Sequence, residues 1–471
     1  MNLSMVMDLY ELSMANGFQQ SLAGDEGVFD VFYRKVPDDG DFVISAGLES
    51  VITAVRDFHF DADDIQYIKN LNLFTPSFID MLANFKFTGD ISAIPEGIPV
   101  LPREPLLTVS GPLEQVQLLE TIILNLINYQ SLIATKAHRI TSAAQGRAVM
   151  EFGSRRAQGP SAAVLGARAA IIGGCSSTSN VLAAKQYGLP ISGTMAHSWI
   201  QAFPDELTAF KKWAEIYPDN CLLLIDTYDV LSSGLPHAIQ VFKQLAADGH
   251  QPIGVRIDSG DIASLAREVR QVLDQAGLHK VKITASSALD EHIIRDMIND
   301  DVPLDSFGVG EKLITSATSP VLSGVFKLSA IRRHGEVIPK IKISGTASKV
   351  TLPGEKLTYR LYDRVTQQMV GDLIALKREQ VMDTIIGQRI NGKVQSQEET
   401  LTHFIAIPLQ QQVFNQGQVV YESPDVLHIQ QVKNKNVTAI TQTLAERTDY
   451  PVYISKALAQ LQAELLNHNE S

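Results

Sequence analysis

The chain has 471 residues, of which 45% are hydrophobic and 20% charged, and this composition predicts a globular protein with two or three packed domains. The formal net charge of −12 argues against a general binder of nucleic acid or anionic membranes, although basic residues that gather locally can still hold an anion. Only two cysteines, no signal-peptide pattern and no apolar run of bilayer length predict a cytoplasmic protein without a membrane span.

The first part of the chain is rich in short β segments. Residues 28–37 (VFDVFYRKVP) and 97–112 (GIPVLPREPLLTVSGP) are apolar stretches punctuated by proline, which is typical of strands and turns. A long apolar pattern at 113–141 predicts a strong helix after them. We therefore predict a mixed α+β accessory domain over residues 1–125.

The central region, residues 126–330, repeats a short apolar strand, a polar or glycine-rich end and a helical stretch. The stretch 263–277, for example, places Leu265, Val269 and Leu273 on one helix face and stops at a glycine. Strand ends about 30 residues apart indicate a parallel sheet, because that is the length of one strand and one helix. Seven strand ends are predicted within residues 148–156, 169–177, 190–198, 221–229, 253–261, 281–290 and 305–312. The apolar part of 169–177 fits the end of a preceding helix as well as a strand.

Seven such units predict an α/β fold with a closed or nearly closed βα barrel, and a doubly wound open sheet is the alternative. Both folds bind ligands at the carboxyl ends of parallel strands, where the polar residues of this chain gather. Beyond residue 330 short strands return, so we predict that residues 331–471 form a β-rich segment that packs with the N-terminal domain. The flanking, mainly β accessory domain is then built from both ends of the chain.

Residues at these strand ends have the chemistry of a ligand site. Phe152 and Arg155 offer an aromatic face beside a guanidinium, which suits a planar anionic ring, although a core phenylalanine with a surface arginine gives the same pattern. Arg256 and Asp258 alternate with apolar residues, so both side chains project to one side of their strand. Asp258 and Asp226, at two neighbouring strand ends, can hold Mg²⁺ or ribose hydroxyls.

Small-residue turns follow the last two predicted strands. Backbone N–H groups at Ser286, Ser287, Gly308 and Gly310 can wrap a phosphate there. The stretch 327–356 holds seven Lys or Arg residues against two Glu residues, which predicts either a polyanion site or a solvated basic face.

His197 lies just past a predicted strand end. Such a histidine alone is more often a packing or capping residue. Neighbouring strand ends bring other polar groups to the same rim, and this favours a functional role for His197.

Seven stretches carry a family likeness: DLYELSMANGF, EFGSRRAQGP, GTMAHSW, DTYDVLSSG, GVRIDSGD, DSFGVG, and KVTLPGEK with YRLYD. Together they span residues 8–363 and resemble the nicotinate phosphoribosyltransferase family. The resemblance implies a type II phosphoribosyltransferase, with an irregular α/β barrel, a flanking β-rich domain and a head-to-tail homodimer with shared active sites.

The implied reaction joins nicotinate to 5-phosphoribosyl-1-pyrophosphate with Mg²⁺ and yields nicotinate mononucleotide and pyrophosphate, the entry of nicotinate into NAD synthesis. In this family ATP hydrolysis is coupled to the reaction through a phosphorylated histidine, whose position matches His197. A neutral imidazole is a good nucleophile near pH 7, which suits that role.

The resemblance also implies binding roles. Phe152 stacks on the pyridine ring, and the partner subunit's Tyr10 covers the other face. Arg256 meets the substrate carboxylate, and Arg155 lies near the phosphates or the ring. The remaining implied roles are catalysis or Mg²⁺ binding for Asp226 and Asp258, 5-phosphate binding for Ser286, Ser287, Gly308 and Gly310, and pyrophosphate binding for Arg34, Lys327 and Lys349.

The loop 174–181 (GCSSTSNV) bears on the choice between nicotinate and nicotinamide. Amide-using relatives place an acidic residue here. Ser176, Ser177 and Ser179 bring hydroxyls and no charge that would repel a carboxylate, so the loop favours the acid.

Two positions depart from the family pattern. Glu311 stands where a small hydroxyl residue is usual, and Met7 replaces a threonine. A carboxylate beside a phosphate is unfavourable unless it points away or Lys312 offsets it.

Other functions stay open at this point. A nicotinamide phosphoribosyltransferase is one, and a quinolinate enzyme, which would want a denser basic pocket, is another. A non-catalytic binder of phosphoribosyl ligands need not keep His197. A βα-barrel lyase or isomerase would use Asp258 and Lys312 as acid–base groups.

Overall fold

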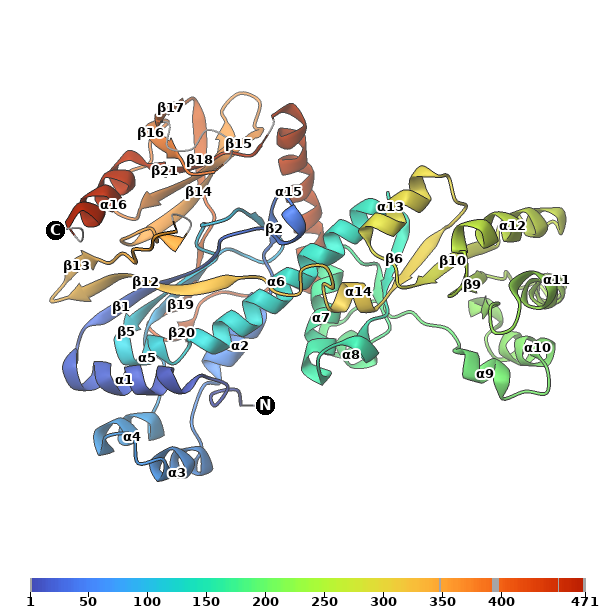
Figure 1. Ribbon diagram of the computed structural model, residues 1–471, viewed down its shortest axis with the longest axis horizontal. Helices are drawn as coiled ribbons and strands as arrows, with labels where there is room; N and C mark the ends of the chain where they lie inside the picture. Colours follow the sequence, from blue (N-terminus) through green and yellow to red (C-terminus); the bar gives the residue numbers. More distant parts are fainter. Residues whose placement is uncertain (1, 347–348, 392–397, 448, 469–471) are drawn as a thin grey trace. The chain divides into compact units, whose positions relative to one another are not determined.

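The computed structural model describes residues 2–346, 349–391, 398–447 and 449–468 (Figure 1). They form two compact units. Unit 1 comprises Met1–Leu132, Val321–Pro424 and Gln431–Ser471, and unit 2 comprises Ile133–Pro320 and Asp425–Gln430. Each unit has its own sheets, and we describe them separately.

Unit 1 contains a seven-stranded sheet to which both ends of the chain contribute. Its strand order is β13 (Glu336–Pro339), β12 (Gly324–Arg333), β1 (Glu26–Tyr33), β5 (Leu107–Pro112), β3 (Asp90–Ala93), β19 (Gln411–Asn415) and β20 (Gln418–Val419). The pairing of β1 with β12 is antiparallel, and in Figure 1 the blue strand lies beside the orange one. The expectation of β-rich structure built from both ends of the chain is confirmed.

A second, six-stranded sheet of unit 1 comes from the C-terminal part. Its order is β17 (Glu398–Thr402), β16 (Thr384–Arg389), β21 (Val452–Ser455), β15 (Met369–Leu376), β14 (Lys356–Asp363) and β18 (Phe404–Pro408). A small pair joins β2 (Val43–Ile44) to β4 (Pro99–Val100). The helices of unit 1 are α1 (Leu9–Ser21), α2 (Leu48–Arg56), α3 (Ala62–Asn70), α4 (Pro76–Ala83), α5 (Leu113–Gln117) and α16 (Lys456–His468).

The helix predicted at 113–141 is present as α5 followed by α6 (Glu120–Ala143). The boundary between the two units falls within α6, and a second boundary falls near the start of α15 (Val426–Glu446). The chain also passes between the units outside these helices, at Pro320–Val321 and at Pro424–Asp425.

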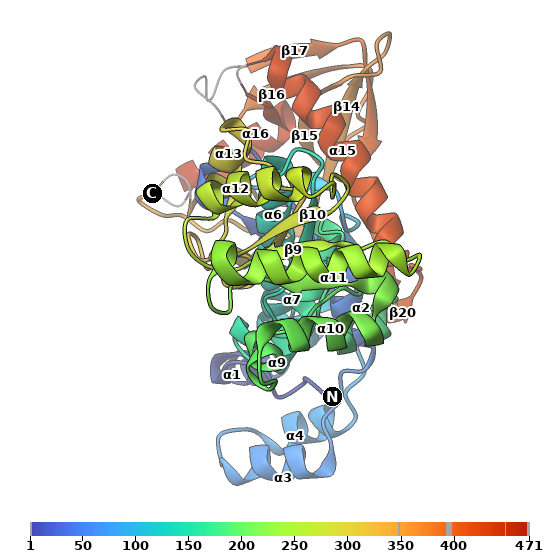
Figure 2. The same cartoon turned by 90° about the vertical axis from the view of Figure 1, so that its right-hand side faces the viewer.

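Unit 2 is built on a six-stranded sheet in which all ladders are parallel. The order is β7 (Ser177–Thr178), β6 (Ala148–Glu151), β11 (Ser306–Val309), β10 (Lys282–Ser287), β9 (Gly254–Ile257) and β8 (Leu222–Leu224). Its helices are α7 (Pro160–Gly173), α8 (Val181–Tyr187), α9 (His197–Gln201), α10 (Glu206–Ile216), α11 (Leu235–Ala247), α12 (Ile262–Gln275), α13 (Glu291–Asn299) and α14 (Glu311–Ile314). Figure 2 shows α10, α11 and α12 side by side along one side of this unit.

The sheet curls into a half-barrel with its edges at β7 and β8. The segment between these edges makes only scattered bonds: one bridge joins Thr178 to Ile191, and the Thr194 hydroxyl donates to the Leu222 carbonyl at 2.7 Å. The strand predicted at 190–198 is therefore wrong as a ladder strand. Proline at its first position has no N–H to donate, which is one physical reason.

A second predicted strand is also misplaced. The apolar run in 169–177 belongs to α7, and only Ser177–Thr178 forms a strand. An apolar run of this length fits a buried helix as well as a strand, and here proline at the first helical position starts the helix. The other five predicted strand ends follow β6, β8, β9, β10 and β11.

A buried ion pair stabilises the second sheet of unit 1. The Arg360 guanidinium lies on Asp372 at 2.9 Å, with both side chains at most 1% exposed. The Tyr450 hydroxyl donates to the same carboxylate at 3.0 Å. Removing the cation leaves a buried charge with no counter-ion, which costs several kcal/mol.

We expect Arg360→Leu to lower the free energy of unfolding by about 3–5 kcal/mol, as is typical when one partner of a buried pair is removed. Urea unfolding followed by circular dichroism measures the change. Arg364→Leu is the matched control, because Arg364 meets Asp383 at 3.5 Å with both side chains 55% exposed, and its loss costs under about 1 kcal/mol. Equal effects of the two changes would contradict the prediction.

Candidate active site

One cavity of unit 2, about 490 Å³ in volume, gathers residues that follow its parallel strands. It lies where β6, β9, β10 and β11 end, as expected for a parallel sheet. The residues lining it are Phe152, Ser154, Arg155, Arg156, Ser179, Gly193, Thr194, Met195, Ala196, Arg256, Asp258, Ser286, Ser287, Ala288, Gly308, Gly310 and Glu311.

Nine of the predicted site residues line this cavity. They are Phe152, Arg155, Ser179, Arg256, Asp258, Ser286, Ser287, Gly308 and Gly310. Their sequence positions run from 152 to 310, so the parallel sheet brings distant segments to one place. Of the three serines in the loop 174–181, only Ser179 faces the cavity, because Ser176 bonds the Val149 carbonyl and Ser177 bonds Ser192.

The aromatic wall of the cavity depends on a close approach. A Cβ on Gly308 would lie 2.7 Å from two ring atoms of Phe152, so the ring packs directly against the glycine. The Phe152 N–H also donates to the Val309 carbonyl at 2.8 Å, which continues the β6–β11 ladder. Ring and turn are thus fixed against each other.

Glu151 holds the segment that carries Phe152, and sequence reasoning did not identify it. Its carboxylate accepts from the Gly153 N–H and, at 2.5 Å, from the Thr178 hydroxyl. Burial raises the pKa of Glu151, whereas both hydrogen bonds lower it. The signal in the sequence was a carboxylate at the end of a buried strand, immediately before the aromatic residue.

Arg256 presents a poorly neutralised cation to the cavity. Its Nε is buried and has no hydrogen-bond partner among the described residues. Burial lowers the pKa of Arg256, and the charge of Arg155 lowers it further, while Asp258 and Asp226 raise it. A guanidinium in this state favours an anionic ligand, since the ligand would satisfy the unused donor.

Asp226 and Asp258 form one hydrogen-bonded unit. One Asp226 oxygen, Oδ2, accepts from the Asp258 N–H at 3.0 Å and from the Ser259 hydroxyl at 2.6 Å. The Ser286 hydroxyl donates to Asp258 Oδ1. Asp226 lies behind the cavity wall rather than among its lining residues, and it fixes the turn that carries Asp258.

His197 stands beside this unit at the first position of α9. Its Nε2 lies 3.9 Å from Asp258 Oδ2, and its Nδ1 lies 3.1 Å from the Thr227 hydroxyl. Asp258, which lines the cavity together with Arg256, thus lies next to the imidazole, whereas His197 itself is not among the lining residues. Thr227 was not identified from the sequence, although it directly follows Asp226.

The mouth of the cavity carries an ion pair between Arg156 Nε and Glu311 Oε2, 3.4 Å apart. Lys312 does not offset Glu311, because its ammonium bonds Asp290 at 2.7 Å. The option that Lys312 neutralises this carboxylate is therefore wrong, and Arg156 takes that place.

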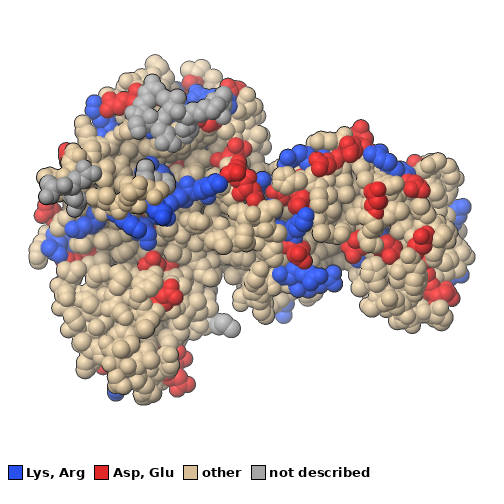
Figure 3. Space-filling model, viewed as in Figure 1, with Lys and Arg blue, Asp and Glu red and all other residues tan. Residues whose placement is uncertain are grey.

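Four predicted residues, Tyr10, Arg34, Lys327 and Lys349, belong to unit 1 and do not line the cavity. Burial lowers the pKa of Lys327, and the charges of Lys342 and Arg34 add to this effect against Glu120. The Nε of Arg34 is buried without a hydrogen-bond partner in the described part of the chain. Figure 3 shows a band of Lys and Arg side chains across unit 1.

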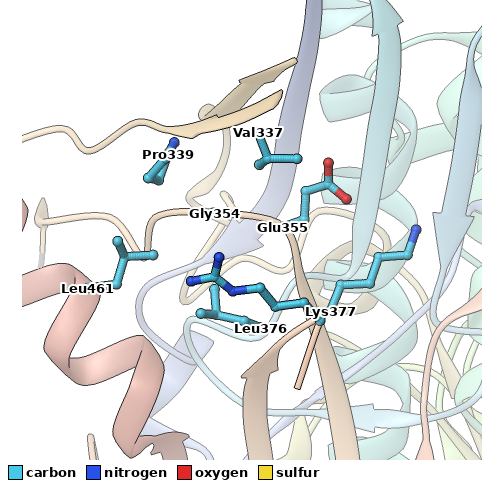
Figure 4. Close-up of a pocket in the computed structure, with 8 residues that line it drawn as sticks. Val337, Pro339, Gly354, Glu355, Leu376, Lys377 and Leu461 are labelled. Carbon is cyan, nitrogen blue, oxygen red and sulfur yellow. The ribbon is translucent and has the colours of Figure 1, made fainter. Parts of the chain in front are cut away.

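A second cavity, about 250 Å³ in volume, lies in unit 1 and contains none of the predicted site residues (Figure 4). Leu376, Leu461, Val337 and Pro339 supply its apolar walls, and Lys377 lies at its rim. Its charged lining residues are Glu355, Lys377 and Arg378, and the Glu355 carboxylate is already paired with Arg332 at 2.6 Å, so we place the chemistry in unit 2.

Two further features are absent from the described residues. No cluster of three or more His, Cys, Asp or Glu side chains has the arrangement of a metal site. No helix there is both long and apolar enough to cross a bilayer. Asp226 and Asp258 therefore supply at most two carboxylate ligands at the predicted Mg²⁺ site.

Three family models cover most of the chain. They are the N-terminal domain of nicotinate phosphoribosyltransferase over residues 5–128, the nicotinate phosphoribosyltransferase family over 147–361, and the C-terminal domain over 355–462. The three matches follow one another in sequence order.

Named relatives and solved structures agree with these models. A nicotinate phosphoribosyltransferase of Bacillus subtilis is 40% identical over 97% of this chain and 93% of its own length. The Homo sapiens protein of that name is 30% identical over 97% and 95%. A crystal structure of human nicotinic acid phosphoribosyltransferase matches with a TM-score of 0.83, at 28% identity over 98% and 100% of the two chains.

A Pyrococcus furiosus structure, titled nicotinate-nucleotide pyrophosphorylase, shares the fold with a TM-score of 0.70 at 23% identity, over 94% of this chain and 96% of its own. The family models and the identities over nearly the whole length lead to one conclusion. The chain belongs to the nicotinate phosphoribosyltransferase family.

Proposed function

We propose that this chain joins nicotinate to 5-phosphoribosyl-1-pyrophosphate, giving nicotinate mononucleotide and pyrophosphate for NAD synthesis. The observation that carries the proposal is the meeting of Phe152, the unsatisfied Arg256 guanidinium and two small-residue turns in one cavity. The names of the relatives support the same substrates.

Nicotinate suits the aromatic side of the cavity. Its ring stacks on Phe152, and its carboxylate accepts hydrogen bonds from Arg256, whose buried Nε then gains a partner. Ser179 adds a hydroxyl without a charge. Nicotinamide would leave the cation unneutralised, so the acid is the favoured substrate.

The phosphorylated sugar suits the opposite side. The turns at Ser286–Ser287 and Gly308–Gly310 offer backbone N–H groups to its 5-phosphate. The ring nitrogen of nicotinate forms a bond to C1 of the ribose while the bond from C1 to the pyrophosphate oxygen breaks. Asp258, held by Asp226 and Ser286, stabilises the positive charge that develops at C1.

His197 is the residue for the ATP-coupled step. Its imidazole attacks the γ-phosphorus of ATP, ADP leaves, and water later releases phosphate from the histidine. The Thr227 hydroxyl fixes the ring by its contact with Nδ1. A phosphoryl group near Asp258 adds negative charge to the region where pyrophosphate binds and leaves. This added charge couples ATP hydrolysis to the phosphoribosyl transfer.

Asp226 and Asp258 supply part of the oxygen ligands that Mg²⁺ needs. Asp226 Oδ1 is buried and lacks a hydrogen-bond partner in the described structure. Asp258 Oδ2 lies 3.9 Å from His197 Nε2, too far for a hydrogen bond. Mg²⁺ in phosphate sites commonly takes one or two carboxylates and completes its shell with substrate oxygens and water. When bound, the ion neutralises the leaving pyrophosphate.

A homodimer with shared active sites is part of the proposal. Helix α1 and the residues before it expose large apolar side chains, namely Met5, Val6, Leu9, Tyr10 and Met14. Such an unpartnered patch favours burial against a second copy, where the partner subunit's Tyr10 covers the nicotinate ring. In that arrangement Arg34, Lys327 and Lys349 bind pyrophosphate.

Two further expectations belong to the proposal. The strand order of unit 2 is that of a ring interrupted between β7 and β8, which supports an irregular barrel closed by the segment 190–194. The low cysteine content, two residues in 471, supports a reducing cytoplasm.

The assay that tests the function follows nicotinate mononucleotide with nicotinate, phosphoribosyl pyrophosphate and Mg²⁺, with and without ATP. We expect product, and stimulation by ATP that His197→Ala abolishes. His279→Ala is the control, because His279 is 70% exposed on Asp274 outside the cavity. Nicotinamide consumed as readily as nicotinate, or full ATP stimulation in His197→Ala, would refute the proposal.

Thr227→Val should reduce the ATP-stimulated kcat by about five-fold, since one neutral hydrogen bond to the imidazole is lost. The KM for nicotinate should stay within about two-fold, because Thr227 is not among the cavity-lining residues. Thr227→Ser keeps the hydroxyl and should restore the rate. A loss in Thr227→Ser as large as that in Thr227→Val would contradict the role of the hydroxyl.

A further inference from the structure

Glu311 places a carboxylate inside the cavity next to the turn that is suited to phosphate. It is the first residue of α14 and directly follows Gly310. Glu311 and Asp258 are the two carboxylates among the residues lining the cavity. The acceptor atoms of Asp258 face Ser286 and His197, whereas Glu311 faces Arg156.

The backbone brings Arg156 and Glu311 together. Arg156 ends a short 3₁₀ turn, Ser154–Arg156, that follows Gly153. A Cβ on Gly153 would lie 2.5 Å from Cβ of Ile314 and 2.9 Å from the Gly310 carbonyl oxygen. The two segments are therefore in direct contact, so the meeting of the two charges follows from the packing.

The pair is weak enough to be displaced. Its Nε–Oε2 distance is 3.4 Å, and the side chains are 58% and 61% exposed, which is the range in which ion pairs add little stability. Lys312 is engaged with Asp290 and does not neutralise Glu311. A phosphate dianion entering the turn competes directly for Arg156.

We propose that the Glu311 carboxylate binds Arg156 in the empty site and must release it when the phosphate of the sugar binds. Glu311 therefore weakens binding of the phosphorylated donor. It also weakens binding of the mononucleotide product, because both carry the same 5-phosphate. The inference rests on the proposed function for the identity of that phosphate.

Glu311→Gln tests this, because the amide keeps the shape and removes the charge. We expect KM for phosphoribosyl pyrophosphate to fall about five-fold, the effect of removing one nearby like charge in a solvated site. Product inhibition should strengthen by a similar factor, while KM for nicotinate should change less than about two-fold. Arg156→Gln should change the donor KM in the opposite direction.

Calorimetric titration with ribose 5-phosphate tests the same idea without turnover. Glu311→Gln should bind this probe about five-fold more tightly than the unaltered chain. Glu215→Gln is the matched control, because Glu215 is also an exposed carboxylate on a cation, Lys212 at 2.7 Å, and it lies outside the cavity. Its affinity should not change.

The outcomes separate the two proposals. A chain that forms no nicotinate mononucleotide refutes the proposed function, even if Glu311→Gln tightens the binding of ribose 5-phosphate. An active Glu311→Gln variant with unchanged donor KM and unchanged affinity for ribose 5-phosphate overturns the role of Glu311. Glu311→Ser, which also lacks the charge, must give the same direction of change.

Discussion

Most groups that face the cavity of unit 2 take their place from the parallel hydrogen-bond ladders of its sheet. The register sets Thr284 opposite Arg256 and Ser286 opposite Gly308, and β11 continues the same register into β6. The strands therefore end at one level, and their next residues meet at one rim. Shifting any strand by one residue would turn its polar side chain to the other face.

Charge at this rim is balanced by hydrogen bonds more than by ion pairs. Asp226 is bonded to the Asp258 N–H, and Asp258 is bonded to Ser286, so neither carboxylate neutralises Arg256 by direct contact. The guanidinium keeps an unused buried donor as a result. The site is thereby preorganised for an anion, because folding has already desolvated the Arg256 guanidinium before the ligand binds.

Sequence reasoning located the cavity because strand ends in a parallel sheet are a matter of chain order. It could not supply what depends on side-chain direction: Thr227 follows a predicted residue, yet only the fold shows that its hydroxyl meets His197. It also failed where a short apolar run fits two structures, as at 169–177, and where a partner came from another segment, as with Arg156 and Glu311. Tyr10, Arg34, Lys327 and Lys349 belong to unit 1, and the roles proposed for them rest on the proposed homodimer.

The pairing of β1 with β12 has a consequence for folding during synthesis. Ser329 bonds the carbonyl of Val28 across 301 positions of the chain, whereas the strands of unit 2 all lie in one continuous stretch. During synthesis all strands of the unit 2 sheet emerge before β12, which is the neighbour of β1 on one side. The earliest residues to emerge must therefore wait for some of the latest, exposing a strand edge that is prone to mispairing until synthesis is well advanced.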